Sequence, residues 1–246
     1  MTDFDKHNNE IQMNLKFWEQ KPILRTIYDD FYSSIVKATN QSIDGKIVEI
    51  GSGIGNLKAH IPNCICTDAF NNPWIDQVEN AYKLSFNDNE VSNIILFDVW
   101  HHLEFPVSAL NEFKRVLKRQ GRIILFEPYI SILGAVVYGI FHPENVGLFK
   151  KINMGEGMSL DKLSYYAAQG NATRFFSQKK YRKYLSGFSI TEKQKLPATA
   201  YVLSGGYGKK QMFPDKYYTK IKKIESLLEG MPSLFATRTL IVLEKL

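Results

Sequence analysis

The chain has 246 residues, of which 44% are hydrophobic and 23% are charged, so its composition excludes the disordered and fibrous classes of protein. Its net charge of +6 is unevenly divided: residues 1–128 carry 13 basic against 17 acidic side chains, whereas residues 129–246 carry 18 against 8. The second half therefore either meets an anionic partner, such as a phosphate, a carboxylate or a membrane surface, or forms a solvated basic surface.

No targeting segment, membrane span or metal site is expected. The first ten residues are polar and acidic rather than basic and then apolar. The longest apolar run, residues 129–141, is shorter than the roughly 20 residues that cross a bilayer. Cys64 and Cys66 match neither a CxxC pair nor a zinc pattern, so they are interpreted as buried thiols. These features predict a cytoplasmic protein.

A helical segment leads into a glycine turn. Apolar residues recur at spacings of three to five over residues 9–39, and Pro22 is expected to divide this segment into two helices. The strand Lys46–Ile50 then runs into glycines at three alternate positions, Gly51, Gly53 and Gly55. A glycine turn after a buried strand lets backbone N–H groups approach a ligand closely, so this turn predicts a cofactor site.

A second strand, Cys64–Asp68, ends in a carboxylate. Asp68 lies nineteen residues beyond Glu49, which is close to the offset of about 20 at which a dinucleotide-binding unit places an acid on ribose hydroxyls. Strand, glycines, helix, second strand and terminal acid together make a stronger signal than the glycines alone.

Strands and helices continue to alternate, which predicts a parallel sheet with right-handed crossovers. The expected elements are a short helix at 72–80, a strand at 92–99, a helix at 106–118 and a strand at 122–126. After Pro128 the pattern predicts helices at 129–141, 160–168, 177–185 and 215–229, strands at 189–196 and 237–244, and a glycine-rich loop at 204–210.

Five strings in order carry a family resemblance: VEIGSGIGN, CTDAF, NAYKLSF, FDVWHHLEFP and FKRVLKRQGRIILFEP. Together they resemble the class I S-adenosylmethionine-dependent methyltransferases, in the small-molecule branch typified by ubiquinone and sugar methyltransferases, over residues 46–128. The resemblance implies an α/β fold, Rossmann-like, with a seven-stranded mostly parallel sheet whose last strand is antiparallel. Helices cover both faces, a helical segment precedes the sheet, and a helical insertion follows the fifth strand.

The expected organisation is a single domain over residues 1–246. It comprises an N-terminal helical cap at 1–45, a cofactor-binding core at 46–128, a helical acceptor-side insertion at 129–187 and C-terminal strands that complete the sheet at 188–246.

The resemblance also implies roles for particular residues. Glu49 interacts with the methionine end of S-adenosylmethionine, the glycine turn with Ser52 allows its close approach, and Asp68 accepts hydrogen bonds from the ribose hydroxyls. Trp100 is expected beside the cofactor. Asn80 and Ala81 stand where the family usually has Asp–Ala reading the adenine edge, and Asn can still accept from the adenine amine. The sequence departs from the family pattern at a second place, where Gln120–Gly121 stands in place of the common Gly–Gly. This position is in a turn remote from the cofactor.

Methyl transfer from a sulfonium is an in-line displacement, so positioning and exclusion of water carry much of it. A general base is needed only for a reluctant acceptor such as a hydroxyl, and O-methylation is the reaction we expect. Candidates for the base are His101, His102 and His142, with packing, cofactor contact or helix capping as their alternative roles. The aromatic residues after Pro128, with Lys209 and Lys210, suit an anionic, aromatic or lipid-linked acceptor.

Other functions remain as alternatives. The protein could be a catalytically silent S-adenosylmethionine-binding partner or regulatory protein, and residues 129–141 with the basic half could contact a membrane surface. The GxGxG spacing disfavours a nicotinamide enzyme. A nucleic-acid substrate is disfavoured because Asp98-Val99-Trp100-His101 replaces the Asn/Asp-Pro-Pro-Tyr/Phe motif of the amino-methyltransferases. The sequence indicates neither the acceptor nor the oligomeric state.

Overall fold

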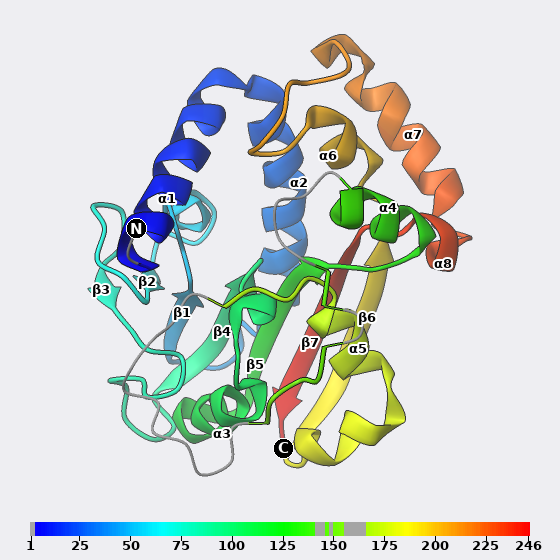
Figure 1. Cartoon of the computed structure of the whole chain (residues 1–246). Helices are drawn as coiled ribbons and strands as arrows, with labels where there is room; N and C mark the ends of the chain where they lie inside the picture. The colour runs from blue at the N-terminus through cyan, green and yellow to red at the C-terminus, as the bar shows by residue number, and fades with distance from the viewer. Residues whose placement is uncertain (1–2, 141–145, 148–149, 155–165) are drawn as a thin grey trace.

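The computed structural model describes residues 3–140, 146–147, 150–154 and 166–246. A single seven-stranded sheet runs through the molecule in the order β3-β2-β1-β4-β5-β7-β6 (Figure 1). Its strands are β1 (Lys46–Ile50), β2 (Cys64–Asp68), β3 (Gln77–Val78), β4 (Val91–Phe97), β5 (Leu117–Pro128), β6 (Phe188–Leu196) and β7 (Arg238–Lys245).

Only β7 runs against its neighbours. The pairs from β3 to β5 are parallel, whereas β7 is antiparallel to both β5 and β6. Its arrow points the opposite way from β4 and β5 in Figure 1. This topology confirms the predicted fold: a Rossmann-like, mostly parallel α/β sheet with a reversed last strand.

Two apolar layers pack on the two faces of the sheet, because successive side chains of a strand point to opposite faces. One layer joins Ile94 and Leu96 to α3 (Pro106–Val116) and α5 (Asn171–Ser177). The other joins Ile95 to α2 (Pro22–Ala38), α6 (Thr199–Ser204) and α7 (Tyr218–Leu228). The central strands are consequently buried on both sides, as their continuous apolar runs predict.

The N-terminal segment forms two helices, α1 (Asp3–Gln20) and α2, and α2 begins at Pro22 as predicted. Proline suits the first turn of a helix because its missing N–H would have no partner there. Lys21, at the junction of the two helices, is buried and reaches the distant loop at 204–210. Its ammonium donates to the carbonyl oxygens of Ser204 at 3.0 Å, of Gly206 at 2.6 Å and of Lys209. The helix junction is therefore fixed to this loop.

Some predicted elements differ from the structure. The predicted helix at 72–80 is a series of turns leading into β3, because the Asn72 side chain accepts from the Trp74 N–H at 3.0 Å and competes with helical bonding. The glycine turn leads into a short 3₁₀ helix, η1 (Asn56–Ala59), instead of an α-helix. Residues 179–185, predicted as α-helical, form the 3₁₀ helix η3 (Lys179–Leu185).

The remaining helices are α4 (Ile132–Ile140), within the predicted span of 129–141, and α8 (Pro232–Phe235), with two 3₁₀ turns, η2 (Trp100–His102) and η4 (Asp215–Tyr217). His142 and most of the helix predicted at 160–168 lie outside the described residues. Across the described part of the chain, no helix has both the length and the hydropathy to span a bilayer.

Candidate functional site

A cavity of about 1330 Å³ lies at the carboxyl ends of the parallel strands. Open α/β sheets bind ligands at this edge. The volume exceeds the roughly 300–1,000 Å³ of common ligand pockets, so the cavity has room for two molecules side by side. Its walls come from α1, the glycine turn, the ends of β2 and β4, the turn η2, helix α4 and the loop at 204–210.

The three glycines of the turn have different surroundings. Each has a left-handed φ, +70° at Gly51, +54° at Gly53 and +66° at Gly55. A Cβ on Gly51 would lie 2.4 Å from the Val99 side chain, and one on Gly55 would lie 2.8 Å from the Trp74 carbonyl oxygen. A Cβ on Gly53 would meet nothing within 4 Å, and Gly53 lines the cavity. Gly53 is therefore the position that leaves room for a ligand, whereas Gly55 serves packing.

This difference predicts that two alanine substitutions have different main effects, one on cofactor affinity and the other on stability. Gly53→Ala is expected to cost roughly 1–2 kcal/mol of stability through its left-handed φ and to weaken cofactor binding at least about tenfold, because its methyl group enters the cavity. Gly55→Ala is expected to destabilise the fold by about 3 kcal/mol through its clash with Trp74. Urea unfolding and calorimetric titration with S-adenosylhomocysteine measure the two effects. If Gly53→Ala and Gly55→Ala weakened binding of S-adenosylhomocysteine in the same proportion to their loss of stability, the assignment of Gly53 to the cavity and of Gly55 to packing would be contradicted.

Asp68 lies at the floor beside this turn and is buried. Its Oδ2 accepts from the Gly53 N–H at 3.1 Å and its Oδ1 from the Ala69 N–H at 2.7 Å. His7 of α1 forms an ion pair with the same Oδ1, with Nε2 3.1 Å away. Burial lowers the pKa of His7, but the hydrogen bond and charge of Asp68 outweigh it and leave the pKa raised. Helix α1 thus closes the cavity over Asp68.

Glu49 is the second buried acid of the floor. Its Oε2 lies 3.8 Å from the Cys66 sulfur, which donates to it. Burial raises the pKa of Glu49 well above that of an exposed glutamate, and Cys66 raises it further. A cation bound beside this carboxyl, such as the amino group of an amino-acid ligand, would favour its ionised form and lower its pKa.

The raised pKa of Glu49 predicts a gain of stability in Glu49→Gln. The folded-state pKa exceeds the unfolded one, so the wild type loses stability as pH rises above the unfolded value of about 4.3. We expect Glu49→Gln to gain about 1 kcal/mol at neutral pH, with no gain in acid, and to lose at least about tenfold in cofactor affinity. Thermal unfolding of the wild type and of Glu49→Gln, measured from acid to neutral pH, tests this prediction. A difference in stability between the two proteins that does not change with pH would contradict it.

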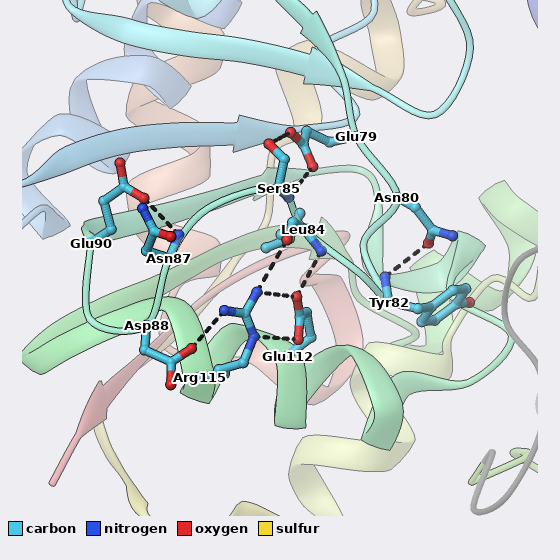
Figure 2. Close-up of polar contacts among 10 residues, drawn as sticks. All are labelled: Glu79, Asn80, Tyr82, Leu84, Ser85, Asn87, Asp88, Glu90, Glu112 and Arg115. Atoms are coloured by element: carbon cyan, nitrogen blue, oxygen red, sulfur yellow. Dashed lines mark hydrogen bonds and ion pairs between the residues drawn. The ribbon is translucent and has the colours of Figure 1, made fainter.

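The loop around Leu84 is held by helix α3 (Figure 2). Glu112 accepts from the Leu84 N–H at 2.7 Å, and Arg115 donates to the Leu84 carbonyl oxygen at 3.1 Å while pairing with Glu112. The side chain of Asn80 accepts from the Tyr82 N–H at 2.9 Å, so it caps a local turn. Ala81 lines the cavity and Asn80 does not.

Glu79, which the sequence analysis did not select, lines the cavity beside Ala81. Its carboxylate is buried and accepts from the backbone N–H of Ser85 at 2.9 Å and from the Ser85 hydroxyl. The family resemblance drew attention to the next position, because an Asp–Ala pair is usual there.

The turn η2 puts three neighbouring candidate site residues, Trp100, His101 and His102, in different surroundings. Trp100 is fully buried against Phe175 and Phe176 and does not line the cavity, so its predicted place beside the cofactor is corrected to a core position. Trp100 opens the turn η2, and its large indole fills the apolar layer on one face of the sheet.

His101 and His102 both line the cavity but are held differently. His101 is buried, with Nδ1 2.8 Å from Glu127 Oε2 and Nε2 3.1 Å from the Gln169 amide nitrogen. Glu127 is buried as well and accepts from the Trp100 N–H at 2.6 Å. The pair of His101 and Glu127 therefore fixes the turn.

His102 is only partly buried, and its Nδ1 lies 2.8 Å from the Tyr166 carbonyl oxygen. A carbonyl can only accept, so Nδ1 carries the proton and, in the neutral ring, the lone pair is on Nε2. This tautomer is the one that a general base uses at Nε2.

An ion pair between Asp98 and Arg238 also lines the cavity and was not predicted from the sequence. Asp98 follows β4 with a left-handed φ of 57°, which is uncommon outside glycine and concentrates at functional sites. Arg238, at the start of β7, is buried and its guanidinium lies 4.4 Å from the ring centroid of Tyr201. An acid directly after a buried strand was a visible signal, but its partner is 140 positions away.

Fold and site define the class. The strand order with a reversed β7, and the glycine turn over two buried acids, are those of class I S-adenosylmethionine-dependent methyltransferases. Residues 48–125 match the sequence model of a methyltransferase domain. The predicted class agrees with these findings: residues 48–125 form a methyltransferase domain, and the chain has the fold of class I S-adenosylmethionine-dependent methyltransferases.

Solved structures agree with this fold at low sequence identity. A Thermotoga maritima S-adenosylmethionine-dependent methyltransferase, described as a possible histamine N-methyltransferase, is 16% identical with a TM-score of 0.59, over 96% of this chain and 98% of that one. Geranyl diphosphate C-methyltransferase of Streptomyces coelicolor A3(2) is 12% identical with a TM-score of 0.52, over 89% and 76%. No curated protein matches the chain.

The residues present fit S-adenosylmethionine as cofactor. The space over Gly53 would be filled by a Cβ, Asp68 presents a buried carboxylate beside it, and Glu49 lies beneath the turn. Within the described residues, no group of three or more His, Cys, Asp or Glu side chains is arranged to hold a metal ion.

Proposed function

We propose that the protein methylates an oxygen atom of a small amphiphilic or anionic acceptor. The observation that carries this proposal is that one cavity is lined both by the donor-side residues Gly53 and Asp68 and by His102, a candidate base with a defined tautomer. A cavity of about 1330 Å³ suits a donor and an acceptor bound together.

When bound, S-adenosylmethionine supplies an electrophilic methyl group on a positively charged sulfur. In this proposal Asp68 holds the ribose hydroxyls, Glu49 faces the amino-acid end and Gly53 gives the backbone its close approach. The Streptomyces coelicolor neighbour was solved with S-adenosylhomocysteine, the demethylated product, which supports this choice of ligand. These residues orient the donor, and helix α1 keeps water from the cavity.

His102 would take the proton of the acceptor hydroxyl, which would make the hydroxyl oxygen a nucleophile for the methyl group that the donor supplies, with S-adenosylhomocysteine as the leaving group. Nε2 has the lone pair for this step because Nδ1 is bonded to the Tyr166 carbonyl. His101 acts indirectly in this scheme: together with Glu127 it keeps the turn that presents His102. We infer no role for His142.

The acceptor side would be built by residues 129–187 and 188–246. Apolar side chains of α4, Leu133 and Val137, line the cavity there with the aromatic ring of Tyr138. Lys209 and Lys210 lie on the cavity wall in the loop at 204–210 and give it positive charge. An apolar wall with a basic margin favours an acceptor that has an apolar body and an acidic group.

An acceptor screen tests the proposal. Purified protein is incubated with S-adenosylmethionine and with catechols, phenolic acids, quinol analogues and long-chain hydroxy acids, and release of S-adenosylhomocysteine is measured. We expect turnover with acceptors that combine a hydroxyl, an apolar body and an acid. Binding of the cofactor without turnover on any acceptor would instead favour the catalytically silent alternative, and failure to bind either cofactor form would overturn both.

A further inference from the structure

An apolar patch is exposed beside the mouth of the cavity. It consists of three residues of α4 and three of the α7–α8 region, namely Ile132, Val136, Ile140, Leu227, Met231 and Leu234. Ile132, Ile140 and Leu227 are 66%, 69% and 75% exposed, which is unusual for side chains of this size. The Ser131 hydroxyl joins the two parts by donating to the Leu234 carbonyl oxygen at 3.1 Å. Figure 1 shows α4 and α8 side by side with the end of α7.

Helix α4 is apolar throughout, because its nine residues, ILGAVVYGI, include no charged side chain. Only Gly134 and Tyr138 are buried. At about 1.5 Å per residue it is about 14 Å long, less than half of the roughly 30 Å hydrocarbon core of a bilayer. A helix of this kind can lie in the plane of a membrane interface but cannot cross it.

A basic cluster continues the patch along α7. Lys220 and Lys223 of α7 are exposed and three residues apart, hence on one side of the helix, and Lys216 is exposed in the preceding turn η4. Two exposed acids, Asp215 and Glu229, lie at the ends of this region, and Glu225 between them is buried. The lysines therefore outnumber the exposed acids on the surface next to the apolar patch.

The cavity opens on this surface. Val136 and Ile140 belong to the apolar patch and also line the cavity, as do Lys209, Lys210 and Met212 in the facing loop. A soluble small acceptor would need no exposed apolar rim around the mouth, whereas an apolar rim beside lysines matches the two layers of an anionic lipid surface: acyl chains below and charged headgroups above.

We propose that this face docks on an anionic lipid surface, with the apolar patch among the headgroups and the basic cluster over their negative charges. Docking places the mouth of the cavity against the lipid. The inference goes beyond methyl transfer and does not depend on it, because it rests on the outer surface of α4, α7 and α8.

Sedimentation of the full chain with vesicles tests this surface. We expect binding to vesicles of equal phosphatidylcholine and phosphatidylglycerol at low salt, little binding to phosphatidylcholine alone, and release as salt rises. The double variant Ile132→Ser with Ile140→Ser is expected to bind at least about tenfold more weakly. Lys220→Glu with Lys223→Glu is expected to bind at least about twentyfold more weakly.

Matched controls use similar side chains elsewhere on the surface. Val78→Ser removes an exposed apolar residue of β3, and Lys179→Glu with Lys180→Glu reverses two exposed charges of η3. Both should bind like the wild type. The proposal is overturned if the wild type does not bind the mixed vesicles at low salt, if the controls lose as much binding as the test variants, or if the patch instead joins two copies of the chain and lipid does not compete. No donor or acceptor is present, so failure here is distinct from failure of methyl transfer.

Discussion

Replacing Asp68 by asparagine is expected to weaken binding of S-adenosylmethionine and S-adenosylhomocysteine by about 100-fold, since both ribose hydroxyls lose a charged acceptor. The carboxylate is buried and already accepts from two backbone N–H groups, so it is fixed in place before a ligand arrives. Asparagine keeps the shape and part of the hydrogen bonding, and the fold should therefore survive. Calorimetric titration with S-adenosylhomocysteine measures the change directly.

Asp29→Asn provides the control for this substitution. Asp29 is an exposed acid that pairs with His60 outside the cavity, so its variant should bind the cofactor like the wild type. If Asp68→Asn kept the wild-type affinity at unchanged stability, the ribose contact would have to be assigned to another residue.

Replacing His102 by alanine is expected to lower kcat by about 100-fold or more on a hydroxyl acceptor, because the proton then has no acceptor on the protein. Cofactor affinity should stay unchanged, since the substitution removes no group from the floor around Asp68 and Glu49. The measurement is the rate of S-adenosylhomocysteine release at saturating donor, with the acceptor that the screen selects, together with a calorimetric titration of the variant.

His101 and His60 separate a catalytic effect from a structural one. His101→Ala should lower the unfolding temperature through loss of the buried contact with Glu127, whereas His102→Ala should lower it little. His60→Ala, at a histidine outside the cavity, should leave turnover unchanged. A His102→Ala enzyme with full kcat would refute the role of the base and favour an acceptor that attacks without one.

The central strands β1, β4 and β5 were predictable because they contain continuous apolar runs bounded by glycine, proline or polar turns. The parallel core, the break at Pro22 and the reversed last strand were all expected from the sequence and its resemblance, and all are present. The prediction that failed was a local one, the helix at residues 72–80. The spacing of its apolar residues is typical of a helix, but the Asn72 side chain and a proline favour turns there.

The site was predictable where its residues lie near one another in the sequence. Gly51, Gly53 and Asp68 meet at the cavity as expected from one strand–turn–helix–strand unit. Trp100 was misplaced because the resemblance did not predict that the turn η2 follows β4 and that the indole packs in the core. The pair of Asp98 and Arg238 was missed for another reason: only the sheet order brings the end of β4 close to the start of β7.

The ammonium of Lys21 connects helix α1 to the loop at 204–210, which are the two parts of the cavity wall proposed to meet the donor and the acceptor. Lys21 stands at the root of α1, which covers Asp68, and holds the backbone of the loop that carries Lys209 and Lys210. If the proposed sites are correct, a displacement of α1 that admits the donor would pull on the wall that meets the acceptor. Two ligands joined in this way bind with a coupling free energy, and the arrival of the first changes the affinity for the second.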